Sequence, residues 1–335
     1  MKVLLYTEGL KTVGKSGLGH AVRHQMNALE SNEIEYTTDP SELDSVDIVH
    51  INWYLLKSYF LAKEAKKRGK KVVYHAHSTE EDFRNSFLFS NQLAPLFKWW
   101  ICKCYRLGDV IITPTEYSKK ILLSYRLDKP IYAISNGIDT SFFERHDEYR
   151  EEFLNQYSFS KKDKIIMGVG LFLKRKGILD FVELARRMPE YQFIWFGYLD
   201  LKLVPKEIRS AVSNKLDNLT FAGYVEQEFL RKAYSSVDLY LFPTLEETEG
   251  IPILEALVAK TPTLVRDIPV FEEFITDKEV YKAKDIDEFE EKIRKILNGT
   301  LPDLTEVGYQ KAIQKDIKVV GTQLVQVYQD LIQDQ

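Results

Sequence analysis

The sequence predicts an α/β protein built from two doubly wound parallel sheets, and three observations support this class. Short apolar runs that are typical of buried strands alternate with helical segments along the chain, as expected for parallel sheets. The chain has 335 residues, more than one hydrophobic core usually holds, so we expect two domains. A share of 44% hydrophobic and 29% charged residues is ordinary for a globular protein.

Composition also limits the compartment and the partners. The two cysteines, Cys102 and Cys104, cannot build a disulfide framework, so we expect a reducing cytosol. No run approaches the ~18 apolar residues of a membrane-spanning helix, and the first apolar run is too short for a signal peptide. Net charge is −4, yet residues 57–129 carry 15 Lys and Arg against 7 Asp and Glu, or +8. This basic segment predicts contact with an anionic membrane surface, and we expect no nucleic-acid partner.

The first half of the chain predicts one doubly wound sheet. We expect helices at 21–29, 54–68, 93–106 and 117–124, and strands at 2–7, 47–52, 71–75, 108–115 and 131–134. In open parallel sheets, ligands bind beyond the carboxyl ends of the strands. The loops that follow these strands are therefore the candidate functional segments.

A glycine-rich loop follows the first strand. Gly9 to Ser16 matches the P-loop pattern G-x-x-x-x-G-K-S between a strand and a helix, which makes a P-loop NTPase an alternative function. However, we expect the helix to begin only after Gly17 and Gly19, whereas the Lys-Ser pair of a P-loop opens its helix directly. No later strand ends in an obvious magnesium-binding aspartate. Both points favour a different use of this loop.

Two histidines lie at the end of the third predicted strand. Strand alternation places the side chains of His75 and His77 on one face of the sheet. They could form a metal pair, but the sequence supplies no further ligands, so we predict no metal site. A hydrogen-bonded structural role is the alternative for His75, whereas the position of His77 beyond the strand favours a functional role.

Residues 93–106 predict an aromatic helix with interleaved cations. Neighbouring helix positions point about 100° apart, so Trp99 and Trp100 cannot both face one core. One or both could be an anchor at a membrane interface, with Lys98, Lys103 and Arg106 meeting lipid headgroups. The alternative is a helix buried between the two sheets.

The second half of the chain predicts another sheet of the same kind. We expect strands at 165–170, 191–196, 219–225, 237–244 and 263–265, and helices at 179–188, 228–236, 251–260 and 309–332. Asp285-Ile286-Asp287 formally matches a metal-binding Asp-x-Asp motif. Because it precedes an amphipathic segment, we interpret it as the capped start of a further helix.

Charged side chains follow two strands of this second sheet. Lys174, Arg175 and Lys176 come directly after its first strand and predict a diphosphate clamp, with a solvated cationic turn as the alternative. Glu247 follows the fourth strand, and Glu255 lies eight positions on, in a helix whose start favours an anion. Both carboxylates can therefore face one crevice and bind hydroxyls, with phosphate between them. A solvated acidic loop before an ordinary helix is the alternative.

The run Glu247-Thr248-Glu249-Gly250-Ile251-Pro252-Ile253-Leu254-Glu255, followed by Ala256 and Thr261-Pro262, resembles the signature of the retaining family-4 glycosyltransferases. The resemblance implies a GT-B fold, in which two Rossmann-like domains face a cleft and a C-terminal helix crosses back over the first. Asn136-Gly137-Ile138-Asp139 matches the link between the family's domains. It implies a first domain at 1–138, a second at 139–312 and a returning helix at 313–335.

The resemblance also implies a role for each candidate residue. His77, Glu247 and Lys176 are the expected catalytic residues, with Glu247 at the donor sugar and His77 at the reacting centre. Glu255 is implied at the nucleotide ribose. The other implied donor-binding residues are Gly17, Lys174, Arg175, Gly223, Val225, Gly250, Ile251 and Pro252.

Two departures from the family pattern affect this site. Thr248-Glu249 stands where the family usually has Gly-Phe, which changes the shape of the sugar pocket. Leu171 stands where the family has an arginine, so either Lys174 or Arg175 takes over that charge or phosphate is held more weakly. We expect no metal cofactor.

His75-Ala76-His77 with the following Ser78-Thr79-Glu80-Glu81-Asp82-Phe83-Arg84 resembles the branch of the family that makes glycolipids in Gram-positive bacteria. It implies transfer of glucose or galactose from a UDP-hexose to a membrane glycolipid, with monoglucosyl-diacylglycerol as the expected acceptor. The enzyme is then expected in the cytoplasm, peripherally bound to the inner face of the cell membrane. Another cell-envelope acceptor and a non-catalytic sugar-binding protein are the alternatives. No motif fixes the hexose, the order of addition or the linkage.

Overall fold

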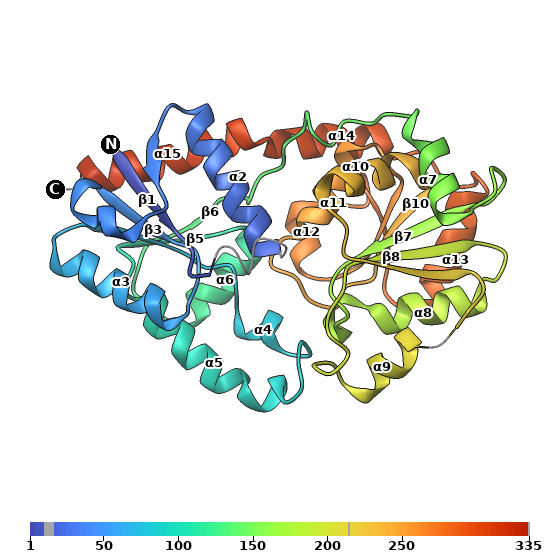
Figure 1. Ribbon diagram of the computed structural model, residues 1–335, viewed down its shortest axis with the longest axis horizontal. Coiled ribbons are helices and arrows are strands. Elements are labelled where there is room, and N and C mark those ends of the chain that lie inside the picture. Colours follow the sequence, from blue (N-terminus) through green and yellow to red (C-terminus); the bar gives the residue numbers. More distant parts are fainter. Residues whose placement is uncertain (10–16, 214, 334–335) are drawn as a thin grey trace. The chain divides into compact units, whose positions relative to one another are not determined.

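The computed structural model describes residues 1–9, 17–213 and 215–333, which form two compact units (Figure 1). The first unit comprises Met1–Phe83, Gln92–Asp139 and Lys315–Gln335, and the second comprises Arg84–Asn91 and Thr140–Gln314. Each unit has its own six-stranded parallel sheet with helices. The predicted α/β class with two parallel sheets is therefore confirmed.

The first sheet changes winding direction once. Its strand order is β2-β1-β3-β4-β5-β6, so the chain leaves β1 on one side and returns on the other. The strands are β1 (Lys2–Tyr6), β2 (Glu35–Thr37), β3 (Ile48–Ile51), β4 (Lys71–His75), β5 (Val110–Thr113) and β6 (Ile131–Ala133). Such a reversal, here between β1 and β3, opens a crevice at the carboxyl ends of the strands.

Helices cover both faces of the first sheet (Figure 1). One face packs against α2 (Gly17–Ser31) and α15 (Ile317–Gln333), and the core between them is apolar. The other face packs against α3 (Leu56–Lys67), α5 (Ser90–Tyr105) and α6 (Glu116–Ser124). Two shorter elements, η1 (Pro40–Ser45) and α4 (Glu80–Phe83), lie in the connections.

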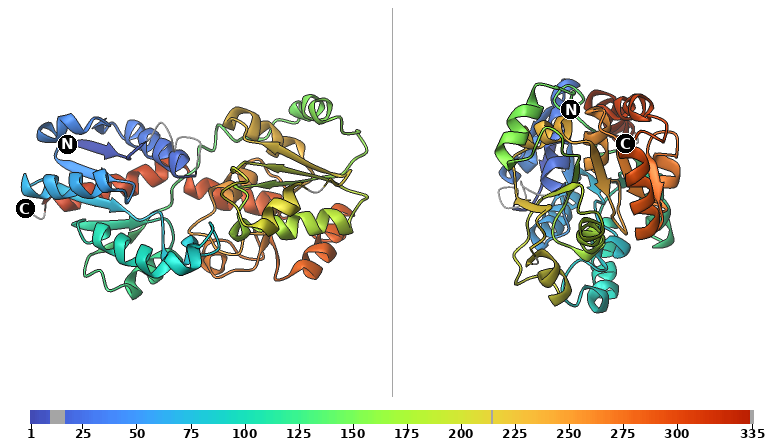
Figure 2. Two further views of the ribbon diagram at one scale, coloured as in Figure 1. Left: turned by 60° about the horizontal axis from the view of Figure 1, so that its bottom comes forward. Right: turned by 90° about the vertical axis from the view of Figure 1, so that its right-hand side faces the viewer.

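The C-terminal segment forms two helices where the sequence predicts one. A 3-10 turn, η3 (Ile313–Lys315), separates α14 (Thr305–Ala312) from α15. At this break the backbone of Ile138 donates to the Lys315 carbonyl at 2.9 Å and accepts from the Ile317 N–H at 3.0 Å. These strand-like bonds replace helical ones, which explains the interruption. Beyond it, α15 lies along the first unit, against α2 (Figure 2), as the predicted returning helix does.

The second sheet has the strand order β12-β11-β10-β7-β8-β9. Its strands are β7 (Ile165–Val169), β8 (Gln192–Phe196), β9 (Leu219–Gly223), β10 (Leu239–Phe242), β11 (Thr263–Arg266) and β12 (Tyr281–Ala283). The chain builds outward from β7 to β9, then returns to the other side of β7 for β10. The reversal therefore lies between β7 and β10, as in dinucleotide-binding folds.

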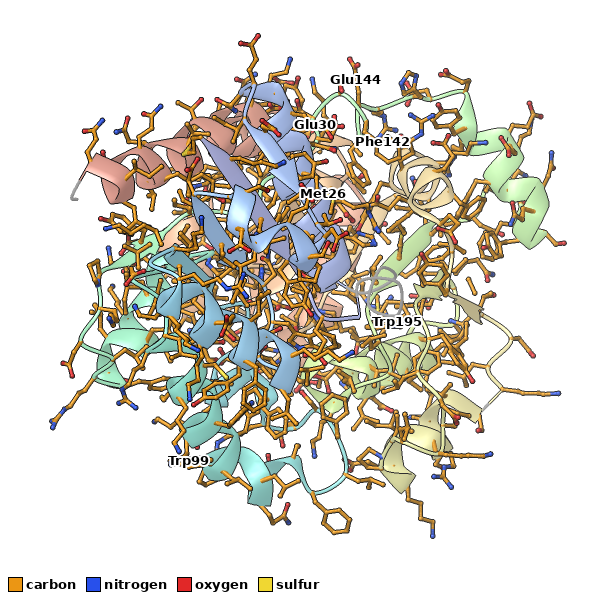
Figure 3. The ribbon with its side chains drawn as sticks, turned by 60° about the vertical axis from the view of Figure 1, so that its left-hand side comes forward. Met26, Glu30, Trp99, Phe142, Glu144 and Trp195 are labelled. Atoms are coloured by element: carbon orange, nitrogen blue, oxygen red, sulfur yellow. The ribbon has the colours of Figure 1, made fainter. Side chains whose placement is uncertain are left out.

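Helices also sandwich the second sheet. On one face α8 (Ile178–Arg187), α9 (Lys206–Ser213) and α13 (Ile286–Leu297) enclose a core that includes Trp195 of β8 (Figure 3). The other helices of this unit are α7 (Tyr149–Tyr157), α10 (Gln227–Ser236), α11 (Ile251–Val258), α12 (Val270–Phe274) and α14. Asp285 accepts hydrogen bonds from the backbone of Asp287 and Glu288, so the predicted capped helix start is confirmed.

None of the helices in the described ranges combines the length and the apolar character needed to cross a bilayer.

Candidate functional site

The second unit brings three charged groups together at its sheet reversal. Lys176 lies in the 3-10 turn η2 (Lys174–Lys176) after β7, and Glu247 lies in the loop after β10. The Lys176 ammonium is hydrogen-bonded to Oε2 of Glu247, and the Arg175 guanidinium lies 3.7 Å from Oε1. The three side chains are only 11–16% exposed. The structure therefore places two cations against one largely buried carboxylate.

The backbone fixes this arrangement through a close approach at Gly177. This residue has φ +74° and separates η2 from α8. A Cβ atom there would lie 2.1 Å from the carbonyl oxygen of Pro243, which directly follows β10, so only glycine fits. The Arg175 carbonyl then accepts hydrogen bonds from the Leu245 N–H at 2.7 Å and the Thr244 hydroxyl at 3.0 Å. These bonds attach the cationic turn to the loop that carries Glu247.

Arg175, and not Lys174, is the second cation of this cluster. Its guanidinium also donates to the Glu246 carbonyl at 3.0 Å and to the Ser86 hydroxyl at 3.2 Å. Lys174 instead lies 3.3 Å from Glu207, where both side chains are about half exposed. Of the two candidate cations that Leu171 leaves open, only Arg175 faces Glu247.

Glu247 remains ionised at neutral pH. Burial acts to raise the pKa of its carboxyl, but the charges of Lys176 and Arg175 outweigh that effect and hold the pKa below its usual value. A carboxylate can accept hydrogen bonds from hydroxyl groups, and the two cations can bind phosphate oxygens. The three contacting side chains can therefore bind hydroxyl groups and phosphate oxygens side by side.

The second glutamate of the signature is buried within the second unit. Glu255 lies in α11, is 1% exposed, and accepts a hydrogen bond from the Tyr234 hydroxyl at 2.9 Å. Burial raises the pKa of Glu255 to about 7. Sequence reasoning missed Tyr234, which comes from α10 and carries no motif. The hydroxyl of a buried tyrosine needs a partner, but sequence alone does not identify which one.

The start of α11 has the geometry expected of a glycine-capped helix. Gly250 is the N-cap with φ +93°, and its carbonyl accepts from the Ile253 N–H at 2.9 Å. Ile251 and Pro252 form the first turn. A Cβ at Gly250 would come within 3.1 Å of Ile253 and 3.6 Å of Glu247. The helix start and the ionised carboxylate are therefore close neighbours.

Gly223 and Val225 lie farther along the same sheet edge. Gly223 ends β9, which β7 and β8 separate from β10. It has φ +74°, and a Cβ there would meet nothing within 4 Å. The structure therefore places these two residues at the carboxyl edge of the sheet but not among the charged cluster.

In the first unit, the histidine pair lies as the strand pattern predicts. The rings of His75 and His77 stack with centroids 4.1 Å apart and planes 4° apart, so both occupy one face. Nε2 of His77 lies 2.8 Å from Oδ1 of Asn52, which follows β3. Burial lowers the pKa of His77 to about 3, so its ring is neutral at pH 7. A neutral imidazole can accept or donate a hydrogen bond but carries no charge to a ligand.

The glycine loop of the first unit is described only in part. Residues 10–16, which hold most of the P-loop match, lie outside the described residues. Gly17 opens α2, so the helix begins two residues earlier than the expected start after Gly19, and that expectation was wrong. A Cβ at Gly17 would meet nothing within 4 Å. The late helix start is therefore no longer an argument against the P-loop.

The two tryptophans of α5 face different surroundings. Trp100 is half-buried and donates its indole N–H to the Tyr54 carbonyl at 2.6 Å. Trp99 is exposed on α5 (Figure 3), with the Lys103 ammonium 4.1 Å from its ring centroid. Lys98 pairs with Glu80 at 3.2 Å. Of the predicted surface residues, Trp99 and Lys103 therefore form one exposed pair.

Comparison with known proteins matches both units. A family described as "Glycosyltransferase Family 4" matches residues 39–142, and one described as "Glycosyl transferases group 1" matches residues 149–314. The processive diacylglycerol alpha-glucosyltransferase of Acholeplasma laidlawii is 42% identical over 334 residues, which are 99% of each chain. The alpha-galactosylglucosyldiacylglycerol synthase of Streptococcus pneumoniae is 25% identical over 262 residues, covering 76% of this chain and 66% of that protein.

Among solved structures, HepE from Anabaena, in complex with UDP and glucose, matches with a TM-score of 0.78 at 14% identity. The match covers 98% of this chain and 100% of that one. Sucrose-phosphate synthase from Thermosynechococcus elongatus matches with a TM-score of 0.72 at 17% identity, over 87% and 75% of the two chains. These likenesses establish the fold.

We predict that Glu255→Gln changes how stability depends on pH. The folded pKa of about 7 exceeds the ordinary value of 4.5, so the folded chain binds more protons than the unfolded chain between these values. This group's contribution to stability is therefore present below about pH 4.5 and is lost as pH rises to about 7. The glutamine side chain does not ionise, so the variant does not lose this stability as the pH rises. Relative to the wild type, its stability should rise between about pH 5 and pH 8, by on the order of 1–3 kcal/mol.

Thermal unfolding of both proteins across this pH range measures the difference. Glu144→Gln, at an exposed position of the same unit, is the matched control and should follow the wild type. Parallel curves for Glu255→Gln and the wild type would contradict the prediction.

Proposed function

Because the chain belongs to the family-4 glycosyltransferases, we propose that it transfers glucose from UDP-glucose to a diacylglycerol-based glycolipid, with retention at the anomeric carbon. The main support for this proposal is the full-length identity of 42% with an enzyme named as a diacylglycerol alpha-glucosyltransferase. The proposed acceptor is monoglucosyl-diacylglycerol. UDP-galactose is the alternative donor, since a relative from Streptococcus pneumoniae is named for a galactosyl product.

The charged cluster of the second unit suits this reaction. The bond from the anomeric carbon to the diphosphate oxygen breaks, and negative charge develops on the leaving UDP. Lys176 and Arg175 would stabilise that charge, while Glu247 would accept hydrogen bonds from the sugar hydroxyls beside them. The start of α11 at Gly250 adds backbone N–H groups. We propose that these groups replace a metal ion, so activity should persist in EDTA.

The roles proposed for Glu255 and His77 rest on the family resemblance. Glu255 would accept hydrogen bonds from the ribose, and His77 would contact the transferred sugar near the reacting centre. The neutral state of His77 fits a hydrogen-bonding role. We propose no covalent intermediate on the enzyme.

Membrane contact is proposed for the surface formed by α3 and α5. The two helices are neighbours, since the rings of Tyr59 and Trp100 lie 5.3 Å apart. Their outer sides carry large apolar residues that are about half exposed or more, namely Leu56, Phe60, Leu93, Leu96 and Trp99. Exposed apolar groups beside lysines are typical of proteins that bind the surface of an anionic bilayer. We propose a peripheral location at the cytoplasmic face of the membrane.

The reaction is tested with labelled UDP-glucose and UDP-galactose, each against liposomes that contain diacylglycerol or monoglucosyl-diacylglycerol, with and without EDTA. We expect label in the lipid phase from UDP-glucose with monoglucosyl-diacylglycerol, at the same rate in EDTA. Label only in non-lipid acceptors would contradict the lipid acceptor and leave the transferase assignment standing. Loss of activity in EDTA would contradict the metal-free mechanism.

Arg175→Gln should weaken UDP binding more than Lys174→Gln does. Arg175 faces the ionised Glu247, whereas Lys174 faces solvent and Glu207. A charge-assisted hydrogen bond contributes about 1.5–3 kcal/mol, so we expect a loss of roughly 10- to 100-fold in affinity for Arg175→Gln. Calorimetry with UDP gives both constants. Equal losses in the two variants would contradict the assignment of Arg175 as the second phosphate-binding cation.

Trp99→Ala should reduce binding to anionic liposomes without reducing turnover of a detergent-solubilised acceptor. The exposed indole would otherwise enter the interface, and its loss should lower the partition coefficient by about tenfold. Co-sedimentation with phosphatidylglycerol vesicles measures the change. Tyr198→Ala, an exposed aromatic of the second unit, is the matched control and should bind as the wild type does. Equal binding of the Trp99 variant would rule out this surface.

A further inference from the structure

A continuous line of polar contacts runs through the first unit from its last helix to the histidine pair. Tyr328 of α15 is fully buried, and its hydroxyl is hydrogen-bonded to Nδ1 of His50 on β3. Nε2 of His50 lies 3.2 Å from Nδ1 of His75 on β4. His75 in turn stacks on His77. The rings of Tyr328, His50 and His75 therefore connect the C-terminal helix to His77, the candidate catalytic histidine, through direct contacts.

The contacts favour one arrangement of the protons, which follows from the orientation of the Gln25 amide. The amide nitrogen of Gln25 lies 2.9 Å from Nδ1 of His75 and can only donate, so that Nδ1 accepts. Nε2 of His50 contacts the same Nδ1, and this contact is a hydrogen bond when His50 holds its proton on Nε2. A neutral His50 has one N–H, so its Nδ1 accepts and the Tyr328 hydroxyl donates. In this arrangement the Tyr328 hydroxyl donates to His50, which stabilises the tautomer of His50 that matches His75.

Burial keeps the rings of His50 and His75 neutral, as this arrangement of protons requires. It lowers the pKa of His50 to about 3 and the pKa of His75 well below its usual value. It also raises the pKa of Tyr328 well above its usual value, so the hydroxyl retains its proton.

The other ring nitrogen of His75 is not held by a hydrogen bond in the described part of the chain. Its Nε2, which holds the proton in this arrangement, has no hydrogen-bond partner among the described residues. The ring is therefore held on its Nδ1 side, by Gln25 and His50, and by its stacking contact with His77. A reorientation of His50 reaches His77 through this ring.

We propose that Tyr328 is a positioning residue for His77, acting through the tautomer of His50 and the orientation of His75. The inference rests on the proposed function for the role of His77. The ring of Tyr328 packs among apolar side chains of the sheet and α15, such as Val327 and Leu331, where phenylalanine would pack equally well. The hydroxyl is the part that reaches His50, so its removal isolates the polar contact.

Tyr328→Phe tests the proposal in the full chain, with histidine labelled by ¹⁵N. In the wild type we expect His50 and His75 to be protonated at Nε2 and bare at Nδ1. In the variant we expect mixed tautomers at His50 and shifted signals from His75 and His77. We expect kcat to fall about 3- to 10-fold, the value of one hydrogen bond, with UDP affinity unchanged.

Val327→Ala is the matched control, because it removes packing from the neighbouring position of α15 and leaves the hydroxyl in place. Its histidine spectrum and kcat should equal those of the wild type below its melting temperature. Protonation of His75 at Nδ1 in the wild type would overturn the proposal. An unchanged His77 signal in Tyr328→Phe would do so as well. Both spectra are recorded without substrate, so they remain decisive even if the lipid assay fails.

Discussion

A buried carboxylate held by two cations organises the second unit. Taking Glu247 out of water is unfavourable unless its charge is balanced, and Lys176 and Arg175 provide that balance from the neighbouring loop. Removing one partner of such a pair typically costs about 3–5 kcal/mol, because the other charge is left buried. The loops after β7 and β10 are therefore fixed relative to each other, and the carboxylate stays ionised.

The first unit places uncharged polar side chains at the carboxyl edge of its sheet. Its polar residues after β3 and β4, Asn52 and His77, belong to a network whose histidines are neutral because they are buried. The second unit thus concentrates charge, which suits a diphosphate, whereas the first offers hydrogen bonds without charge, which suits hydroxyl groups.

Much of the fold could be predicted because buried parallel strands are continuous apolar runs, as at Ile48–Ile51 and Leu239–Phe242. The edge strand β2 was missed because its three residues, Glu35–Thr37, are polar and partly exposed. The break before α15 could not be foreseen, since it depends on hydrogen bonds to Ile138, which is distant in sequence. In the site, the spacing of Glu247 and Glu255 was informative. The choice between Lys174 and Arg175 was not, because it depends on contacts with Ser86 and Glu246.

The place of α15 in the first unit has a consequence for biosynthesis. Val320, Leu324, Val327, Tyr328 and Leu331 complete one face of a core whose strands begin at residue 2, yet the ribosome makes these residues after the whole second unit. While the second unit is made and folds, this face of the N-terminal sheet is covered by α2 but not yet by α15. The apolar surface that α15 covers therefore stays exposed to solvent until the end of translation. The core of the first unit is completed last, although its strands are made first.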